Sequence, residues 1–132
     1  VVVNNDVFTT TDDGATWTAV AIKDVFPYTY PRGITIPPAD PKTVFLTIGD
    51  TTPGRIGTVM RSQDTGKTWE NLSLSDPPNS AMWVVNVQPA NPQIAFAGSR
   101  YGHLYRSNDG GNSWNKQWRE FSEISSVLSI PG

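Results

Sequence analysis

The chain has 132 residues, a net charge of −2 and no cysteine, which suits one ordinary domain and excludes disulfides and thiolate metal sites. The weak negative charge gives no electrostatic basis for binding nucleic acid, and no apolar run has the length of a membrane span. Eleven Gly, eleven Pro, five Trp, four Tyr and five Phe favour short strands joined by turns over disorder.

Short β-type runs separated by turn residues follow one another along the first part of the chain. Strands are predicted over residues 1–3, 7–9 and 17–22, with a turn at residues 4–6. After an aromatic, proline-containing loop at 24–31, further strands are predicted over residues 33–36, 43–48, 58–61 and 69–74. No stretch has a helical period, so the sequence predicts an all-β chain.

The same series of strands then repeats in the second part of the chain. Strands are predicted over residues 82–87, 94–97, 103–106 and 114–118, followed by a lone strand over 124–130. The turn sequences Pro38-Ala39-Asp40-Pro41 and Pro89-Ala90-Asn91-Pro92 lie 51 residues apart at matching points of the series. One repeat therefore has four strands, which we call A, B, C and D, as in the blade of a propeller.

One octapeptide, Ser/Thr-x-Asp-x-Gly-x-Ser/Thr-Trp, occurs at residues 10–17, 62–69 and 107–114, each time between predicted strands C and D. It predicts a hairpin turn in which the aspartate accepts backbone hydrogen bonds and the glycine adopts a positive φ. We expect the tryptophan to bury its ring under the turn. The residues assigned to this structural role are Asp12, Gly14, Trp17, Asp64, Gly66, Trp69, Asp109, Gly111 and Trp114.

The octapeptide resembles the Asp-box, or bacterial neuraminidase repeat, of sialidases, sortilin-type receptors, some endo-acting glucanases and photosystem II assembly factors. The resemblance covers nearly the whole chain and implies a β-propeller of four-stranded antiparallel blades with Asp-box hairpins. The chain is most similar to bacterial and archaeal neuraminidase-repeat proteins loosely labelled glycosyl hydrolases, whose tails are similar to residues 118–124. This resemblance implies a secreted, periplasmic or cell-surface location.

The repeats divide the chain into about three blade equivalents. Residues 1–23 are expected to supply strands B, C and D of one blade, 24–75 and 76–120 to be complete blades, and 121–132 to supply strand A of a closing blade. Propellers have roughly four to eight blades. We therefore expect the chain to associate with the remaining blades of a larger propeller or with a second copy of itself, and favour the first.

The connections between strands B and C and between strands D and A are expected at one end of the blades, opposite the octapeptides. Binding residues lie disproportionately on such loops above a rigid scaffold. The arginines there could bind a carboxylate or a glycan, or could instead stack on neighbouring aromatic rings. The candidate ligand-binding residues are Arg32, Asp50, Arg55, Arg100, Tyr101, Trp118 and Arg119.

Other chemistry has less support in the sequence, and no metal or cofactor site is predicted. The octapeptide aspartates could ligate calcium, but turn capping explains each copy. His103 is the only histidine, so a His-based metal site is excluded and a structural or solvated role is expected. Trp83 is expected in the core. Asp50 and Glu120 could form a glycosidase acid pair, although nothing in the sequence places them at the required separation.

Two functions fit these features. The first is a non-catalytic propeller scaffold that binds a protein or glycan through its loops. The second is a glycoside hydrolase, sialidase-like or glucanase-like, with carboxylates on the same loops. Sialidases carry an arginine triad, a tyrosine–glutamate pair and a Phe/Tyr-Arg-Ile-Pro motif, and residues 30–34 are similar to that motif only in part. The lack of a recognisable acid pair favours the scaffold.

Overall fold

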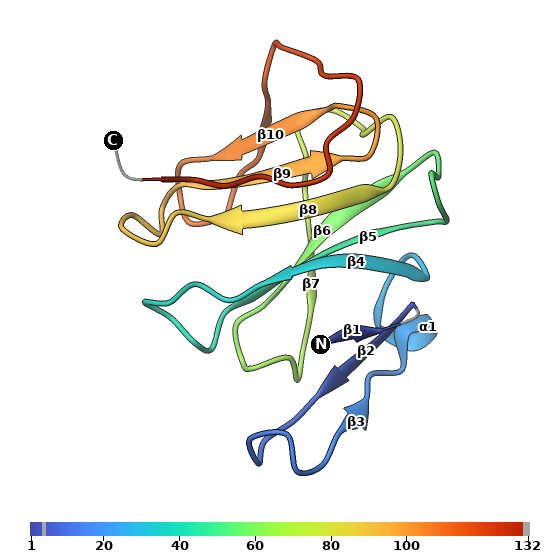
Figure 1. Cartoon of the computed structure of the whole chain (residues 1–132), viewed down its shortest axis with the longest axis vertical. Helices are drawn as coiled ribbons and strands as arrows, with labels where there is room; N and C mark the ends of the chain where they lie inside the picture. Colours follow the sequence, from blue (N-terminus) through green and yellow to red (C-terminus); the bar gives the residue numbers. More distant parts are fainter. Residues whose placement is uncertain (4, 131–132) are drawn as a thin grey trace.

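A computed structural model describes residues 1–3 and 5–130 of the chain. Asn4, in the predicted turn at 4–6, and Pro131 and Gly132, at the end of the predicted closing segment, lie outside the described residues. The described strands form three antiparallel sheets, which are stacked in chain order from the bottom to the top of Figure 1.

Within each sheet every strand pairs with its neighbour in the chain. The first sheet contains β1 (Val2–Val3), β2 (Asp6–Thr9) and β3 (Thr18–Ala19). The second contains β4 (Tyr30–Thr35), β5 (Val44–Gly49), β6 (Gly57–Ser62) and β7 (Glu70–Leu72). The third contains β8 (Met82–Val87), β9 (Ala95–Ser99), β10 (Leu104–Ser107) and β11 (Asn115–Lys116). The predicted meander of four-stranded antiparallel sheets is therefore confirmed for the second and third sheets.

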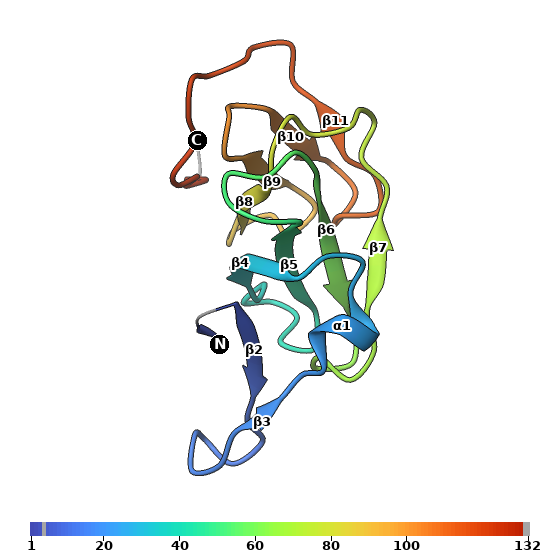
Figure 2. The same ribbon diagram turned by 90° about the vertical axis from the view of Figure 1, so that its right-hand side faces the viewer.

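Successive sheets pack face to face, with β4 and β8 along one side of the stack and β7 and β11 along the other (Figure 2). Side chains of a strand alternate between its two faces. In β5, Leu46 and Ile48 therefore join the core against the first sheet, while Phe45 joins the core against the third sheet. Because both faces of the second sheet are covered, all six residues of β5 are buried.

The three octapeptides form the same hydrogen-bonded turn. In the third copy, Asp109 accepts hydrogen bonds from the backbone N–H and the hydroxyl of Ser113, at 2.9 and 2.6 Å. The Ser107 hydroxyl oxygen accepts a bond from the Gly111 N–H at 2.8 Å. The first and second copies repeat these bonds. Each turn needs its glycine, because φ at these positions is 87–90° in Gly14, Gly66 and Gly111.

The tryptophans of the three copies differ in burial. Trp114 is 1% exposed and packs edge-on against Phe45 of the preceding sheet, with ring centroids 6.2 Å apart. Trp69 packs in the same way against Phe26, at 5.2 Å. Trp17 is 51% exposed, so the prediction that it buries its ring under the turn is wrong for the first copy. The reason is that no described sheet precedes the first one.

A single helical turn, α1 (Ile22–Val25), replaces the predicted end of the strand at 17–22 and the start of the following loop. Ile22, the first residue of α1, and Phe26, which follows α1, are 7% and 6% exposed, because both enter the core between the first and second sheets. One turn is too short to show a helical period in the sequence. In the described part of the chain, no helix has the length and apolar character of a membrane-spanning segment.

Residues 124–130, predicted as a lone strand, contain no strand in the structure. The segment passes across the face of β8 and β9 (Figure 1), where Ile124 is buried and donates its N–H to the Arg100 carbonyl at 3.3 Å. A β-strand needs a neighbouring strand for its backbone hydrogen bonds. No described strand pairs with this segment, which explains the difference from the prediction.

The packing between sheets predicts that replacing the octapeptide tryptophan by alanine lowers the free energy of unfolding by different amounts in two of the copies. Trp114→Ala should lower the free energy of unfolding by about 3–5 kcal/mol, because it empties a buried site. Trp17→Ala should change it by only about 0.5 kcal/mol, because more than half of the ring is exposed. Urea denaturation of both variants in dilute solution measures the difference. Equal losses of stability would contradict the assignment of these interfaces.

The octapeptide aspartates predict a loss of stability in acid. Hydrogen bonds from the hydroxyl and the N–H of the residue four positions later lower the pKa of Asp12, Asp64 and Asp109 from 3.8 to about 2. Because the folded-state pKa is lowered, the stabilisation is complete above about pH 4 and is lost as the pH falls through about 2. The melting temperature should fall across this range, and should fall less steeply in Asp109→Asn. Thermal melts at closely spaced pH values measure the slopes, and equal slopes would argue against this role.

Candidate functional site

The connections β5–β6, β7–β8, β9–β10 and the segment after β11 gather at one end of the sheets, toward the right-hand side of Figure 1. We call this end the loop face; it comprises residues 20–32, 50–56, 73–83, 100–103 and 117–123, which include the first residues of β4 and β8. The octapeptides belong to the opposite hairpins, between β2 and β3, β6 and β7, and β10 and β11. The connections at the loop face differ in length between repeats, since residues 50–56 join β5 to β6 whereas residues 100–103 join β9 to β10.

Two arginines at the loop face stack on one indole ring. The Cζ atom of Arg32 lies 4.0 Å from the centroid of the Trp83 ring, and that of Arg100 lies 4.9 Å from it. The Tyr30 ring is 6.3 Å from Trp83, and its hydroxyl accepts a hydrogen bond from Nη1 of Arg32 at 3.4 Å. Nη2 of Arg100 lies 3.3 Å from the Glu123 carboxylate. We call these five residues the arginine–tryptophan cluster.

Matching irregularities in two strands bring Arg32 and Trp83 together. The register of β4 against β5 shifts around Arg32, and the register of β8 against β9 shifts around Trp83. The two residues are 51 positions apart, which is the offset of the repeat, so they occupy the same place in successive sheets. A bulge takes a residue out of the ladder and re-aims its side chain. Gly33 donates its N–H to the Thr47 hydroxyl at 2.7 Å, which fixes the bulge beside Arg32.

Hydrogen bonds between two loops hold Arg100 in place. The Arg100 N–H donates to the Ala81 carbonyl at 2.9 Å, and the Tyr101 N–H donates to the Ser80 hydroxyl oxygen at 2.9 Å. The Asn79 side-chain amide donates to the Tyr101 carbonyl at 2.7 Å. The β9–β10 connection is thus tied to the β7–β8 connection on both sides of its backbone. Such a preorganised loop loses little conformational entropy when a ligand binds.

The predicted ligand-binding residues fall into separate parts of the loop face. Arg32 and Arg100 are brought together in the cluster. Tyr101, 43% exposed, and Trp118, 90% exposed, lie in neighbouring loops. Arg119 stacks on Phe121, with its Cζ 5.8 Å from the ring centroid. The exposed Arg55 is in the β5–β6 connection, where its N–H donates to the Asp50 carboxylate at 3.1 Å.

The candidate carboxylates have partners within the protein. Desolvation raises the pKa of Asp50, but hydrogen bonds from the backbone at residues 55, 56 and 51 outweigh it and hold the pKa below its ordinary value. A hydrogen bond from Lys116, the charge of Lys116 and that of His103 lower the pKa of Glu120. No hydrogen bond or ion pair among the described residues joins Asp50 to Glu120. Nor do three or more His, Asp or Glu side chains of the described residues gather as metal ligands would.

The expectation that Trp83 lies in the core is wrong. Its ring is partly exposed and belongs to neither hydrophobic core, because the bulge in β8 turns it toward the two guanidinium groups. Tyr30 and Glu123 were not predicted as site residues. The sequence does contain a signal for the position of Trp83. Trp83 lies at the repeat offset from Arg32, and a residue equivalent to an exposed arginine is not expected in the core.

No family model matches the chain. In sequence, the chain is 32% identical over 104 residues to the xyloglucanase Xgh74A of Acetivibrio thermocellus, and this match covers 70% of the chain. The chain spans only 12% of the length of that relative. The sequence likeness is therefore to a glycosyl hydrolase, over a small part of it.

Two solved structures share the arrangement of sheets. An ancestral GH74 enzyme aligns with a TM-score of 0.65 and 17% identity, over 86% of this chain and 17% of its own. The structure of YCF48 bound to D1 peptide aligns with a TM-score of 0.59 and 19% identity, over 88% of this chain and 35% of its own. Both neighbours are β-propellers. The chain has the β-propeller fold. At these identities the structural likeness extends to the fold alone.

Proposed function

We propose that the propeller to which this chain contributes binds a protein or glycan ligand through its loop face, without catalysing a reaction. The observation that carries this proposal is the stacking of Arg32 and Arg100 on Trp83, at 4.0 and 4.9 Å. A guanidinium group is a planar fork of hydrogen-bond donors that matches a carboxylate, and an indole ring provides a flat apolar surface. The cluster therefore offers both an anion-binding and a stacking contact.

The internal partners of the two arginines leave room for a ligand. Arg32 is exposed and uses one of its five N–H donors on Tyr30. Arg100 pairs with Glu123, whose side chain is 54% exposed. Exposed ion pairs of this kind stabilise a protein by only about 0–1 kcal/mol. A ligand carboxylate or hydroxyl can consequently replace Glu123 at little cost.

We also propose that the three octapeptides are Asp-boxes with a purely structural role. Their aspartates cap the hairpin turn in all three copies, and the turns lie at the end of the sheets opposite the loop face. On this proposal residues 1–23, 24–75 and 76–120 are successive blades, and residues 121–132 belong to the next one. Substitutions in the octapeptides should then alter stability and leave ligand binding intact.

Simultaneous Arg32→Ala and Arg100→Ala substitution should abolish binding at the loop face, because it removes both guanidinium groups while Trp83 remains. Binding is measured on a glycan array and on an array of acidic peptides. Lys67→Ala is the matched control, since it removes a cation from an octapeptide on the opposite hairpin and should leave every signal unchanged. An array signal that survives in the double variant would contradict the proposal.

Glycoside hydrolysis is the second candidate function, and the 32% identity to a xyloglucanase favours it. Such an enzyme needs two carboxyl groups flanking the scissile bond. Asp50 and Glu120 lie on the loop face, but the first caps its own loop and the second pairs with Lys116 and His103. These internal bonds favour the binding function over hydrolysis.

The chain is expected to release no reducing sugar from xyloglucan, because its loop-face carboxylates are already engaged. A reducing-end assay with xyloglucan, and with a sialoside as a second substrate, measures this. Release of sugar that is lost in both Asp50→Asn and Glu120→Gln would replace the binding proposal with the hydrolase. Release that persists in both variants would indicate a contaminating enzyme.

A further inference from the structure

Every backbone group of the β9–β10 connection at residues 100–102 already has a partner within the chain. The three N–H groups donate to the Ala81 carbonyl, the Ser80 hydroxyl and the Ser99 carbonyl, at 2.9, 2.9 and 3.2 Å. The three carbonyls accept from the Ile124 N–H, the Asn79 side-chain amide and the Phe121 N–H, at 3.3, 2.7 and 3.1 Å. A peptide that binds as an added strand gains its affinity from main-chain hydrogen bonds. This connection therefore meets a ligand through its side chains.

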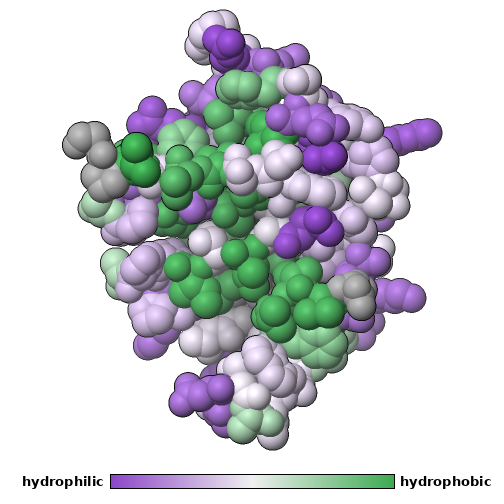
Figure 3. Space-filling model, viewed as in Figure 1, coloured by the Kyte–Doolittle hydropathy of each residue, from purple (hydrophilic) through white to green (hydrophobic). Residues whose placement is uncertain are grey.

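The side chains at this place are cations and aromatic rings. Arg32 and Arg100 stack on Trp83, with their Cζ atoms 4.0 and 4.9 Å from the ring centroid, so both can contact one short segment of a ligand. Tyr101 follows Arg100 and is 43% exposed. In Figure 3, hydrophilic residues protrude along the right-hand edge, where the loop face lies. A guanidinium group pairs with a carboxylate, and an aromatic ring packs against the C–H groups on the face of a sugar ring. A sugar acid presents both of these groups.

The arginine–tryptophan cluster carries one positive charge in excess. Arg32 and Arg100 are cations, and Glu123 is the carboxylate among its five residues. The Arg100 guanidinium lies 3.3 Å from Glu123, and the described residues form no hydrogen bond with its side-chain N–H groups. Arg100 therefore keeps donors for an acceptor on a ligand, and the excess charge favours an anion.

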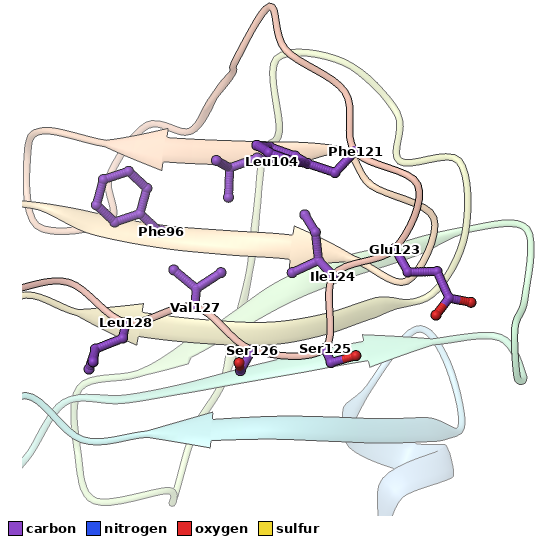
Figure 4. Close-up of a pocket in the computed structure, with 9 residues that line it drawn as sticks. All are labelled: Phe96, Leu104, Phe121, Glu123, Ile124, Ser125, Ser126, Val127 and Leu128. Carbon is purple, nitrogen blue, oxygen red and sulfur yellow. The ribbon is translucent and has the colours of Figure 1, made fainter.

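Glu123 is presented to Arg100 by a fixed backbone. The N–H groups of Phe121 and Ile124, on either side of it, donate to carbonyls of the β9–β10 connection. The segment lies so close to this connection that a Cβ atom at Gly102 would collide with the Phe121 carbonyl oxygen. In Figure 4, Ile124 extends over β9 beside a cavity of about 590 Å³, whereas the Glu123 carboxylate extends toward the ends of the sheets. The backbone is thus held, while the Glu123 side chain, 54% exposed, is free to leave Arg100.

We propose that the ligand of the loop face is a glycan that contains uronic acid residues. This inference rests on the proposed ligand binding and names the class of ligand. The uronate carboxylate pairs with Arg32 and Arg100, and the sugar ring packs on Tyr101. Glu123 leaves Arg100 when the ligand binds and acts as an internal competitor. An uncharged glycan supplies no carboxylate to replace it, so Glu123 makes the site selective for acidic glycans.

Isothermal titration calorimetry of the full chain at low salt tests the ligand class with oligomers of galacturonic acid and of mannuronic acid. Both should bind, whereas the methyl ester of the galacturonic acid oligomer should not, because esterification removes the charge. Arg32→Ala and Arg100→Ala should each weaken binding by roughly tenfold or more, because each removes a charged donor. Lys67→Ala, in the octapeptide of the opposite hairpin, should leave binding unchanged.

Glu123→Gln tests the internal competitor. It should tighten binding of the galacturonic acid oligomer by roughly two- to fivefold, the range expected for an exposed ion pair. Glu120→Gln is the matched control, because it makes the same change on the same segment at a residue that pairs with Lys116 and His103 instead. This control should tighten binding less. Equal gains in the two variants, or weaker binding in Glu123→Gln, would contradict the competitor role.

An acidic peptide separates this inference from the proposed function. If an oligomer of glutamic acid binds more tightly than either uronic acid oligomer, the ligand class is wrong and binding at the loop face stands. Binding of the methyl ester as tight as that of the free acid would also overturn the assignment to uronic acid. If no probe binds and the unaltered chain gives no signal on either array, both the inference and the proposed function are wrong.

Discussion

Face-to-face packing of one sheet on the next is the constraint on which the rest of the structure depends. An antiparallel sheet of short strands cannot bury both faces alone, so its apolar residues need a sheet on either side. The second sheet meets this need, and its central strand β5 is buried throughout. The tryptophans of the second and third octapeptides reinforce the contact, since Trp114 packs against Phe45 of the preceding sheet and Trp69 packs against Phe26. Where that neighbour is lacking among the described residues, the same position is exposed, as in Trp17.

The candidate site is a consequence of this packing. Arg32 comes from the second sheet, and Trp83 and Arg100 come from the third, so the cluster forms only when the two sheets are stacked. The bulges in β4 and β8 turn side chains at the sheet ends out of the core, and the backbone bonds between the loops fix Arg100. The buried interior of the sheets is thus a rigid scaffold, and the residues at the irregular strand ends are the candidate binding groups.

The similarity to known proteins establishes the β-propeller architecture, and the function has to be argued from the residues of the loop face. The related proteins include a xyloglucanase, similar in sequence, and a peptide-bound YCF48, similar in structure, which are different kinds of protein. Propellers perform unrelated functions, because buried residues hold the blades together while the loops bind the ligands. Asp50 and Glu120 on this loop face are bonded within the protein, and this bonding is the basis for proposing ligand binding rather than hydrolysis.

The sequence by itself determined the order of strands, the four-stranded repeat and the three turns, because alternating side chains, turn residues and the octapeptide act over a few neighbouring residues. It also placed Arg32 and Arg100 on the same loop face. Only the tertiary structure decided that they share Trp83, that α1 forms over Ile22–Val25, that Trp17 is exposed, and that residues 124–130 form no strand. Each of these outcomes depends on which element lies opposite a residue across a sheet interface. That neighbour is distant in the sequence, so no local pattern records it.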